Sequence, residues 1–171
     1  TLSDSEWNRL LPMITNDQMT IQDKTEMIQG KGYIINLKMD NGLTKNIKLI
    51  DKTNVYNNRL QVINQYEVPN GTYKNRYDVT ILVNGLPLVH VELKRRGVDI
   101  KEAFNQINRY QRDSFWAGKA MFDYVQIFVI SNGTGTKYYS NTTRYAKEQE
   151  TAQGQRKNKT DGNTFEFTSY W

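Results

Sequence analysis

Two carboxylates and an ammonium group stand where a folded hairpin would bring them together. Asp78 begins one apolar run of the sequence, and Glu92 and Lys94 end the next one. Residues 84–87 separate the runs and begin with Asn-Gly, which is a strong hairpin signal between apolar runs. We expect a loop of about four residues there. Counted outward from that loop, all three charged residues lie near the open end of the hairpin.

The types of these side chains favour a metal site. Side chains alternate along a strand, so Glu92 and Lys94 share a face, and Leu93 between them is expected to point into the core. Two neighbouring carboxylates repel unless a cation lies between them, and such oxygen ligands suit Mg²⁺ or Mn²⁺. A metal held by Asp78 and Glu92 can activate water beside a phosphodiester. Lys94 would orient or deprotonate that water, or stabilise the developing charge.

A surface ion pair at the end of a hairpin is the alternative interpretation. An acid-x-Lys pattern arises easily by chance in a chain of this length, and Asp99-Ile100-Lys101 also has it. That second copy opens a predicted helix, whereas Glu92-Leu93-Lys94 ends an apolar strand with Asp78 placed across from it. The position of the pattern therefore favours metal-dependent hydrolysis of phosphodiesters.

A longer part of the sequence resembles a known family. Residues 75–89, 91–97, 103–111 and 125–133 are similar to the amino-terminal nuclease domain of the restriction (motor) subunit of type I restriction enzymes, which belong to the PD-(D/E)xK nuclease superfamily. The residue before Asp78 is tyrosine rather than the proline of the superfamily's pattern.

The resemblance implies a role for each residue of the site. Asp78 and Glu92 correspond to ligands of Mg²⁺, for which Mn²⁺ can substitute, and the carbonyl of Leu93 corresponds to a further ligand. Lys94 corresponds to the catalytic lysine. Two more catalytic residues, Gln106 and Tyr110, match a Gln-x-x-x-Tyr motif found beside the site in helicase-linked nucleases of the superfamily.

The residues themselves predict a helix for that motif. Asp99 and Glu102 have the spacing of an N-cap and its capping acid, and apolar residues follow at helical period. Gln106 and Tyr110 are four residues apart and lie on one flank of the apolar stripe, so we expect them to border the site rather than fill the core. In the alternative interpretation Tyr110 is a core-edge aromatic residue and Gln106 is solvated.

The order of the elements predicts a mixed α/β fold. Strands are expected over 60–68, 76–83 and 88–94, followed by the helix that starts at 99 and a strand over 124–131, with a returning strand over 136–139. This order is the αβββαβ core of PD-(D/E)xK, restriction-endonuclease-like folds. An N-terminal extension precedes it, with a helix capped by Ser3 and Glu6, a helix over 21–29 that is the candidate leading helix, and a hairpin over 33–50.

We expect one nuclease domain over residues 1–171. Residues 1–55 are expected to form accessory helices and the hairpin, residues 56–140 the catalytic core, and residues 141–171 a linker, which by the resemblance would lead toward helicase motor domains. The chain has no G-x-x-x-x-G-K-[ST] phosphate loop, so ATP would serve only the motor of a full-length subunit. The resemblance also implies protein partners, which are the methylation and specificity subunits of the restriction complex.

The charge of the chain points to double-stranded DNA. The formal net charge is +5 and the pI is near 9.3, although a basic surface can also be merely solvated. The absence of cysteine excludes disulfides and cysteine-bound zinc. No apolar run approaches the roughly 20 residues of a membrane span, and a cytoplasmic location is expected. The basic residues near the proposed site are the DNA-binding candidates Arg76, Arg95, Arg96, Lys101 and Arg109, together with Lys74 and Arg112.

The residues predict a metal-dependent nuclease, and the resemblance implies that it is a type I site-specific deoxyribonuclease. Its Mg²⁺-dependent endonuclease domain would cleave double-stranded DNA after translocation by the motor. Two alternatives stay open, a non-cleaving DNA-binding or subunit-docking module and a repair-type nuclease of the same superfamily outside restriction. His90 lies on the face of Glu92 and Lys94, but a structural histidine is the expected interpretation.

Overall fold

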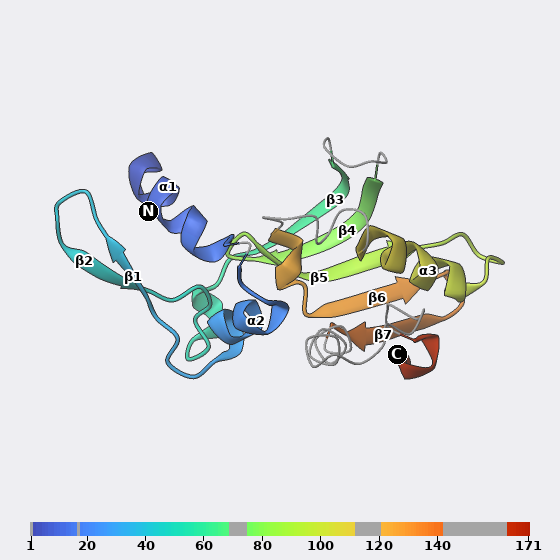
Figure 1. Cartoon of the computed structure of the whole chain (residues 1–171). Coiled ribbons are helices and arrows are strands. Elements are labelled where there is room, and N and C mark those ends of the chain that lie inside the picture. The colour runs from blue at the N-terminus through green and yellow to red at the C-terminus, as the bar shows by residue number, and fades with distance from the viewer. Residues whose placement is uncertain (1, 17, 69–74, 112–120, 142–163) are drawn as a thin grey trace.

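The computed structural model describes residues 2–16, 18–68, 75–111, 121–141 and 164–171. The strands form a main sheet of six strands and a separate sheet of two. The helices and strands are α1 (Asp4–Ile14), α2 (Ile21–Gln29), β1 (Ile35–Lys38), β2 (Thr44–Ile47), β3 (Leu60–Val68), β4 (Asn75–Val83), β5 (Leu86–Leu93), α3 (Ile100–Tyr110), β6 (Ile127–Ser131), β7 (Thr136–Ser140) and β8 (Ser169–Tyr170). Short 3₁₀ helices are η1 (Val55–Asn57), η3 (Met121–Tyr124) and η4 (Phe165–Phe167). Figure 1 shows the main sheet beside a smaller N-terminal part that contains β1 and β2.

The six-stranded sheet has the order β3-β4-β5-β6-β7-β8. The strands pair antiparallel except for β5 and β6, which are parallel and are joined by the crossover that contains α3. A parallel pair needs such a crossover because a tight turn can only reverse the chain. The predicted mixed α/β fold and the strand-strand-strand-helix-strand order are confirmed.

The turn between β4 and β5 is tighter than predicted. Asn84 and Gly85 have φ values of 52° and 86°, the left-handed backbone of a two-residue turn whose twist matches the flanking strands. Leu86 and Pro87 already pair with Val83 and Leu82. The expected four-residue loop was therefore wrong, because the ladder continues to the residue next to the turn.

The N-terminal part forms as the capping signals predict. Ser3 and Glu6 make the expected capping box at the start of α1, and Pro12 lies in its last turn without ending it. Helix α2 ends at Gly30, whose N–H bonds Glu26 O at 2.7 Å. A Cβ at Gly30 would lie 2.5 Å from that same oxygen, so only glycine fits.

Buried side chains join the N-terminal part to the main sheet. Leu10 and Ile14 of α1 and Met27 of α2 belong to one apolar cluster with Leu86 and Tyr124, and the Tyr124 hydroxyl donates to Ile14 O at 2.8 Å. Tyr124 lies in η3, so the predicted strand over 124–131 begins later, at residue 127.

No helix in the described residues is long and apolar enough to cross a membrane.

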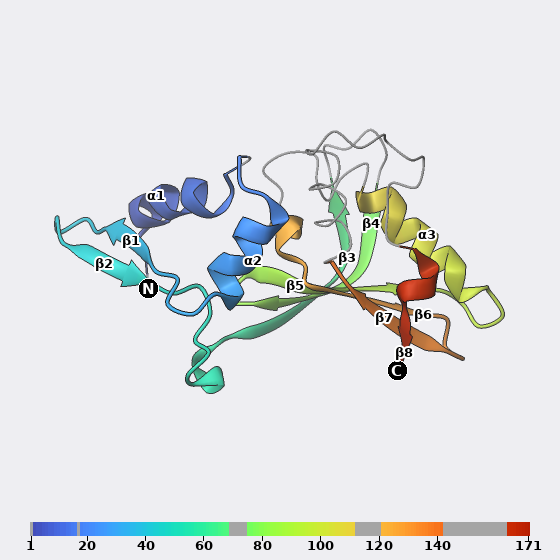
Figure 2. The same cartoon turned by 60° about the horizontal axis from the view of Figure 1, so that its bottom comes forward.

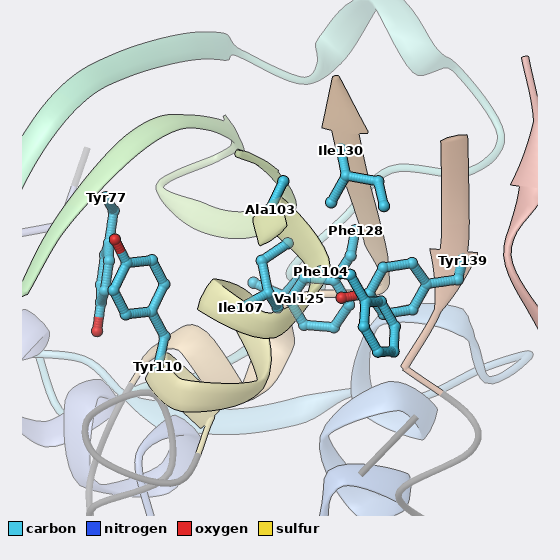
Figure 3. Packing of buried hydrophobic residues seen from close by; sticks show 9 residues of the cluster. All are labelled: Tyr77, Ala103, Phe104, Ile107, Tyr110, Val125, Phe128, Ile130 and Tyr139. Atoms are coloured by element: carbon cyan, nitrogen blue, oxygen red, sulfur yellow. The ribbon is translucent and has the colours of Figure 1, made fainter. Parts of the chain in front are cut away.

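The second apolar cluster fills the space between α3 and the sheet. Its members are Tyr77, Ala103, Phe104, Ile107, Tyr110, Val125, Phe128, Ile130 and Tyr139. Figure 3 shows Tyr77 and Tyr110 together at one end of the cluster, and Phe104 near Phe128 and Tyr139 at the other. The cluster fixes the position of α3 over β5 and β6.

The face of β5 that α3 covers is the polar one. His90 and Glu92 are both 0% exposed, whereas Leu93 is 47% exposed, so the prediction that Leu93 points into the core was wrong. The reason is the crossover. β5 pairs with β6 so that His90 lies beside Phe128 and Glu92 beside Ile130, and α3 returns over that side.

Residues 164–171 pack on the edge of the sheet. Strand β8 pairs with β7, and the Lys137 ammonium lies 4.4 Å from the centre of the Phe165 ring and 4.3 Å from that of Tyr170. Lys137 also donates to Thr168 Oγ1 at 2.9 Å. Of the predicted linker over 141–171, residues 142–163 lie outside the described part of the chain.

Candidate active site

The site lies where β4 and β5 stop pairing. Their ladder reaches Val79 and Val91, and one residue further Asp78 Oδ2 accepts a hydrogen bond from the Leu93 N–H at 2.9 Å. On the other side of β4, Gln65 has a left-handed φ of 52°. Figure 2 shows β3 and β4 curving toward α3 in this region. The Asp78 carboxylate is thereby tied to the strand that carries Glu92.

Glu92 is a buried carboxylate with incomplete hydrogen bonding. Its Oε1 lies 3.2 Å from Lys94 Nζ, and its Oε2 lies 3.6 Å from His90 Nε2. Among the described residues Oε2 has no hydrogen-bond partner. Leaving a buried carboxylate oxygen unsatisfied is costly, and a cation near it removes that cost.

Asp78 and Glu92 therefore fit a hard divalent cation. In the described part of the chain no group of three or more His, Cys, Asp or Glu side chains is arranged as a metal site. Two carboxylates suffice for Mg²⁺, which keeps several waters and takes further oxygens from a substrate phosphate. This chemistry distinguishes the site from a metal cage made only of protein ligands.

A hydrogen-bonded chain runs from Lys94 through α3 to β4. Lys94 Nζ donates to Gln106 Oε1, and Gln106 Nε2 donates to the Tyr110 hydroxyl. That hydroxyl donates to Arg76 O at 2.9 Å. Lysine has only donors, so the Gln106 amide must turn its oxygen to Lys94 and its nitrogen to Tyr110. The motif expected beside the site is thus connected to Lys94.

Tyr110 belongs to the core and to the site at once. Tyr110 is 2% exposed and the centre of its ring lies 5.0 Å from that of Tyr77, so the expectation that Tyr110 would not fill the core was wrong. Burial raises the pKa of Tyr110, and the charges of Glu92 and Asp78 raise it further, while the Gln106 hydrogen bond acts in the opposite direction. The phenol therefore keeps its proton and remains a donor to Arg76 O.

The site opens into a cleft of about 770 Å³. All five predicted catalytic residues line it, together with Leu93 and Arg76. A second hollow, of about 660 Å³, shares Lys94 and Gln106 with the cleft. The complete lining of the cleft is Glu67, Asn75, Arg76, Asp78, Glu92, Leu93, Lys94, Gln106, Arg109 and Tyr110.

The predicted DNA-binding residues divide into two groups. Arg76 and Arg109 line the cleft, and Arg95 lines the second hollow with Arg109. Arg96 and Lys101 line neither of these hollows. Their side chains lie elsewhere, because Arg96 Nη2 donates to Gly133 O at 3.4 Å and Lys101 Nζ lies 5.9 Å from the centre of the Phe165 ring. Two further basic candidates, Lys74 and Arg112, lie outside the described residues.

Two residues of the cleft were not found from the sequence. Glu67 of β3 pairs directly with Arg76 of β4, and Asn75 begins β4. Both line the cleft. The turn signal at residues 69–71 indicates that β3 precedes a hairpin, but it does not give the register that places Glu67 beside Arg76.

The chain is similar to known proteins over most of its length. A family model described as type I restriction enzyme R protein N terminus matches residues 1–147. The chain is 44% identical over 169 residues to the type I restriction enzyme EcoprrI endonuclease subunit of Escherichia coli. This match covers 98% of the chain and 49% of that relative. It is 46% identical over 140 residues to the SauMSSORF170P endonuclease subunit of Staphylococcus aureus strain MSSA476, covering 82% of this chain and 14% of that protein.

The chain spans about half the length of the first relative and a smaller share of the second. The family match extends from the N-terminal part through strands β3 to β7 of the main sheet, which include the strands that carry Asp78 and Glu92. The resemblance inferred from the sequence is thus confirmed, and the chain belongs to the family formed by the N-terminal region of type I restriction enzyme R proteins.

Proposed function

We propose that this chain is the Mg²⁺-dependent endonuclease domain of a cytoplasmic type I restriction enzyme. It hydrolyses phosphodiester bonds of double-stranded DNA within a longer protein whose ATPase motor moves the DNA. Methylation and specificity subunits complete the complex. The relatives that support this proposal are named endonuclease subunits. The observation that carries it is the meeting of Asp78, Glu92 and Lys94 in one open cleft.

The carboxylates and the lysine divide the chemistry between them. Asp78 and Glu92, with the Leu93 carbonyl, would hold Mg²⁺ or Mn²⁺. When bound, the ion supplies Lewis acidity that activates water and neutralises charge on the phosphate. Lys94 has three N–H donors, of which Glu92 and Gln106 take two. The third can bond the attacking water or a phosphate oxygen.

Arginine side chains would hold the DNA backbone along the cleft. Arg76 and Arg109 line it, and Arg95 extends the basic surface into the second hollow. So few cations neutralise few phosphates, and non-specific affinity is expected at about 10⁻⁴–10⁻⁶ M at physiological salt. Delivery of DNA by a motor would compensate for such weak binding.

The test separates cleavage from translocation in the assembled enzyme. Lys94→Ala should reduce DNA cleavage by about 100-fold or more, while ATP hydrolysis and translocation stay at the wild-type level. Lys45→Ala on β2, an exposed lysine outside the cleft, is the matched control and should cut normally. Translocation that falls in parallel with cleavage would mean that Lys94 is structural.

The same assay decides between the proposal and its alternatives. A wild-type enzyme that never cuts DNA with Mg²⁺ or Mn²⁺ would indicate a DNA-binding or docking module. Rapid linearisation of plasmid by this chain without a motor, at about 0.1–0.15 M salt where charges are screened within about 10 Å, would indicate an autonomous nuclease. The family match favours restriction over repair.

A further inference from the structure

A buried polar pair lies directly behind Glu92. Thr80 of β4 and His90 of β5 are cross-strand neighbours, and Thr80 Oγ1 lies 3.3 Å from His90 Nδ1. Thr80 is 1% exposed and His90 is 0% exposed. The other ring nitrogen of His90 faces Glu92 Oε2 at 3.6 Å. The three side chains thus form a row that leads from the inside of the sheet to the cleft.

Aromatic rings fix the orientation of His90. The rings of Tyr77, Tyr110 and Phe128 meet it edge-on, with centroids 5.6, 6.2 and 6.4 Å away. A buried ring held on three sides cannot turn freely. Its two nitrogens therefore keep their directions, one toward Thr80 and one toward Glu92.

The Glu92 carboxylate favours one tautomer of His90, and the Thr80 hydroxyl can accommodate it. A hydroxyl can donate or accept, whereas a neutral imidazole has one donor and one acceptor nitrogen. If Nδ1 carried the proton, Nε2 would turn a lone pair toward the buried Glu92 carboxylate, which is repulsive where water does not screen. Donation from Thr80 to Nδ1 leaves the proton on Nε2, where it attracts Glu92 Oε2.

We propose that Thr80 and His90 are positioning residues that hold the Glu92 carboxylate in the orientation needed to bind the metal. This inference rests on the proposed function. Lys94 holds Oε1 at 3.2 Å, and His90 holds Oε2 from the opposite direction. The Nε2–Oε2 distance of 3.6 Å is longer than a hydrogen bond. Contacts of this kind shorten when an active site is loaded.

The arrangement leaves Glu92 free to bind a metal. Each carboxylate oxygen has two lone pairs, so a contact with His90 or Lys94 uses one and leaves another. Polar partners behind a metal ligand orient it, and their loss typically weakens metal affinity by about 10–100-fold. The row from Thr80 to Glu92 is an arrangement of this type on neighbouring strands.

The experiment measures Mn²⁺ binding by calorimetry with the intact protein. Thr80→Val keeps the shape of the side chain and removes the donor, and His90→Leu removes both nitrogens. Each should weaken Mn²⁺ binding by about 10-fold or more. Thr80→Ser and His90→Gln keep a donor at the critical position and should bind within about threefold of wild type.

Two controls separate positioning from general damage. Val91→Ala removes packing from the opposite face of β5 and should leave Mn²⁺ affinity unchanged, so an equal loss in Val91→Ala would overturn the proposal. In cleavage assays, the Thr80→Val enzyme should need about 10-fold more Mg²⁺ to reach its half-maximal rate. At saturating Mg²⁺ it should reach the wild-type rate, as expected when only the affinity for the metal falls.

The outcomes also distinguish this inference from the proposed function. If Thr80→Val and His90→Leu bind Mn²⁺ like wild type while Asp78→Ala does not, the positioning role is refuted and the metal site stands. If wild type and Asp78→Ala give the same titration, the metal site itself is refuted and the inference falls with it. Thr80→Val keeps the test valid if His90→Leu fails to fold.

Discussion

Replacing Tyr110 by phenylalanine should uncouple Lys94 from β4 while leaving the core intact. The ring stays in its place beside Tyr77, so packing is kept. The hydroxyl accepts from Gln106 Nε2 and donates to Arg76 O at 2.9 Å, and both hydrogen bonds are lost. The Gln106 amide that holds Lys94 then has no anchor on its other side.

The size of the effect follows from those two bonds. Each contributes about 0.5–1.5 kcal/mol to the free energy of unfolding, which gives a total loss of about 1–3 kcal/mol. Gln106 lines the cleft, so water can take the place of part of the lost hydrogen bonding. We therefore expect a loss in the free energy of unfolding in the lower half of that range. Cleavage should fall by about 10-fold, less than for Lys94→Ala, since the ammonium is misplaced rather than removed.

Urea unfolding and single-turnover cleavage at saturating Mg²⁺ measure the two effects. Gln106→Leu is the companion variant, and the double variant completes a thermodynamic cycle. Because both residues belong to one chain of hydrogen bonds, the losses in cleavage should not add. Additive losses, or a Tyr110→Phe enzyme that is less stable but cuts at the wild-type rate, would refute the role assigned to the chain.

Further predictions concern the metal, alkaline pH and the backbone of β3. Asp78→Ala should abolish the Mn²⁺ binding that calorimetry detects in wild type, and indistinguishable titrations would refute its role as a ligand. Burial raises the pKa of Tyr139 well above 10, so the folded state keeps a proton that the unfolded chain loses. Stability should fall above pH 10 by about 1.4 kcal/mol per pH unit from this residue, and urea unfolding of Tyr139→Phe should show a shallower decline. Gln65→Gly should leave the free energy of unfolding unchanged or raise it by up to about 1 kcal/mol, because glycine tolerates a φ of 52°. Gln65→Val should lower it, and equal stability of the two variants would show that the backbone there is unstrained.

Local signals in the sequence were enough to predict most elements. The capping box of Ser3 and Glu6 and the N-cap at Asp99 start α1 and α3 as expected. Asn84-Gly85 makes the turn that brings Asp78 to Glu92 and Lys94. These predictions succeed because caps and tight turns depend on side chains within a few residues.

One error concerns which face of a strand is covered. Alternation along β5 gives two faces but does not say which one receives α3. Apolar Leu93 suggested one face as the core, yet the crossover to β6 buries His90 and Glu92 instead. The covered face depends on the pairing of β5 with β6, a strand that follows only after α3 in sequence. Glu67 was missed for a different reason, because the turn signal after β3 does not give the register that pairs Glu67 with Arg76.

The burial of Glu92 explains why the site needs so many polar neighbours. A carboxylate at the surface is hydrated, whereas a carboxylate buried under α3 must be stabilised by hydrogen bonds from the protein or by a cation. Lys94 and His90 approach its two oxygens, and Gln106 with Tyr110 holds Lys94 in turn. His90 lies on β5, Lys94 directly follows β5, and Gln106 and Tyr110 lie on α3. The aromatic cluster packs α3 against the sheet. The same helix that buries the carboxylate thus supplies the groups that hold its lysine, so the geometry of the site depends on the packing of α3.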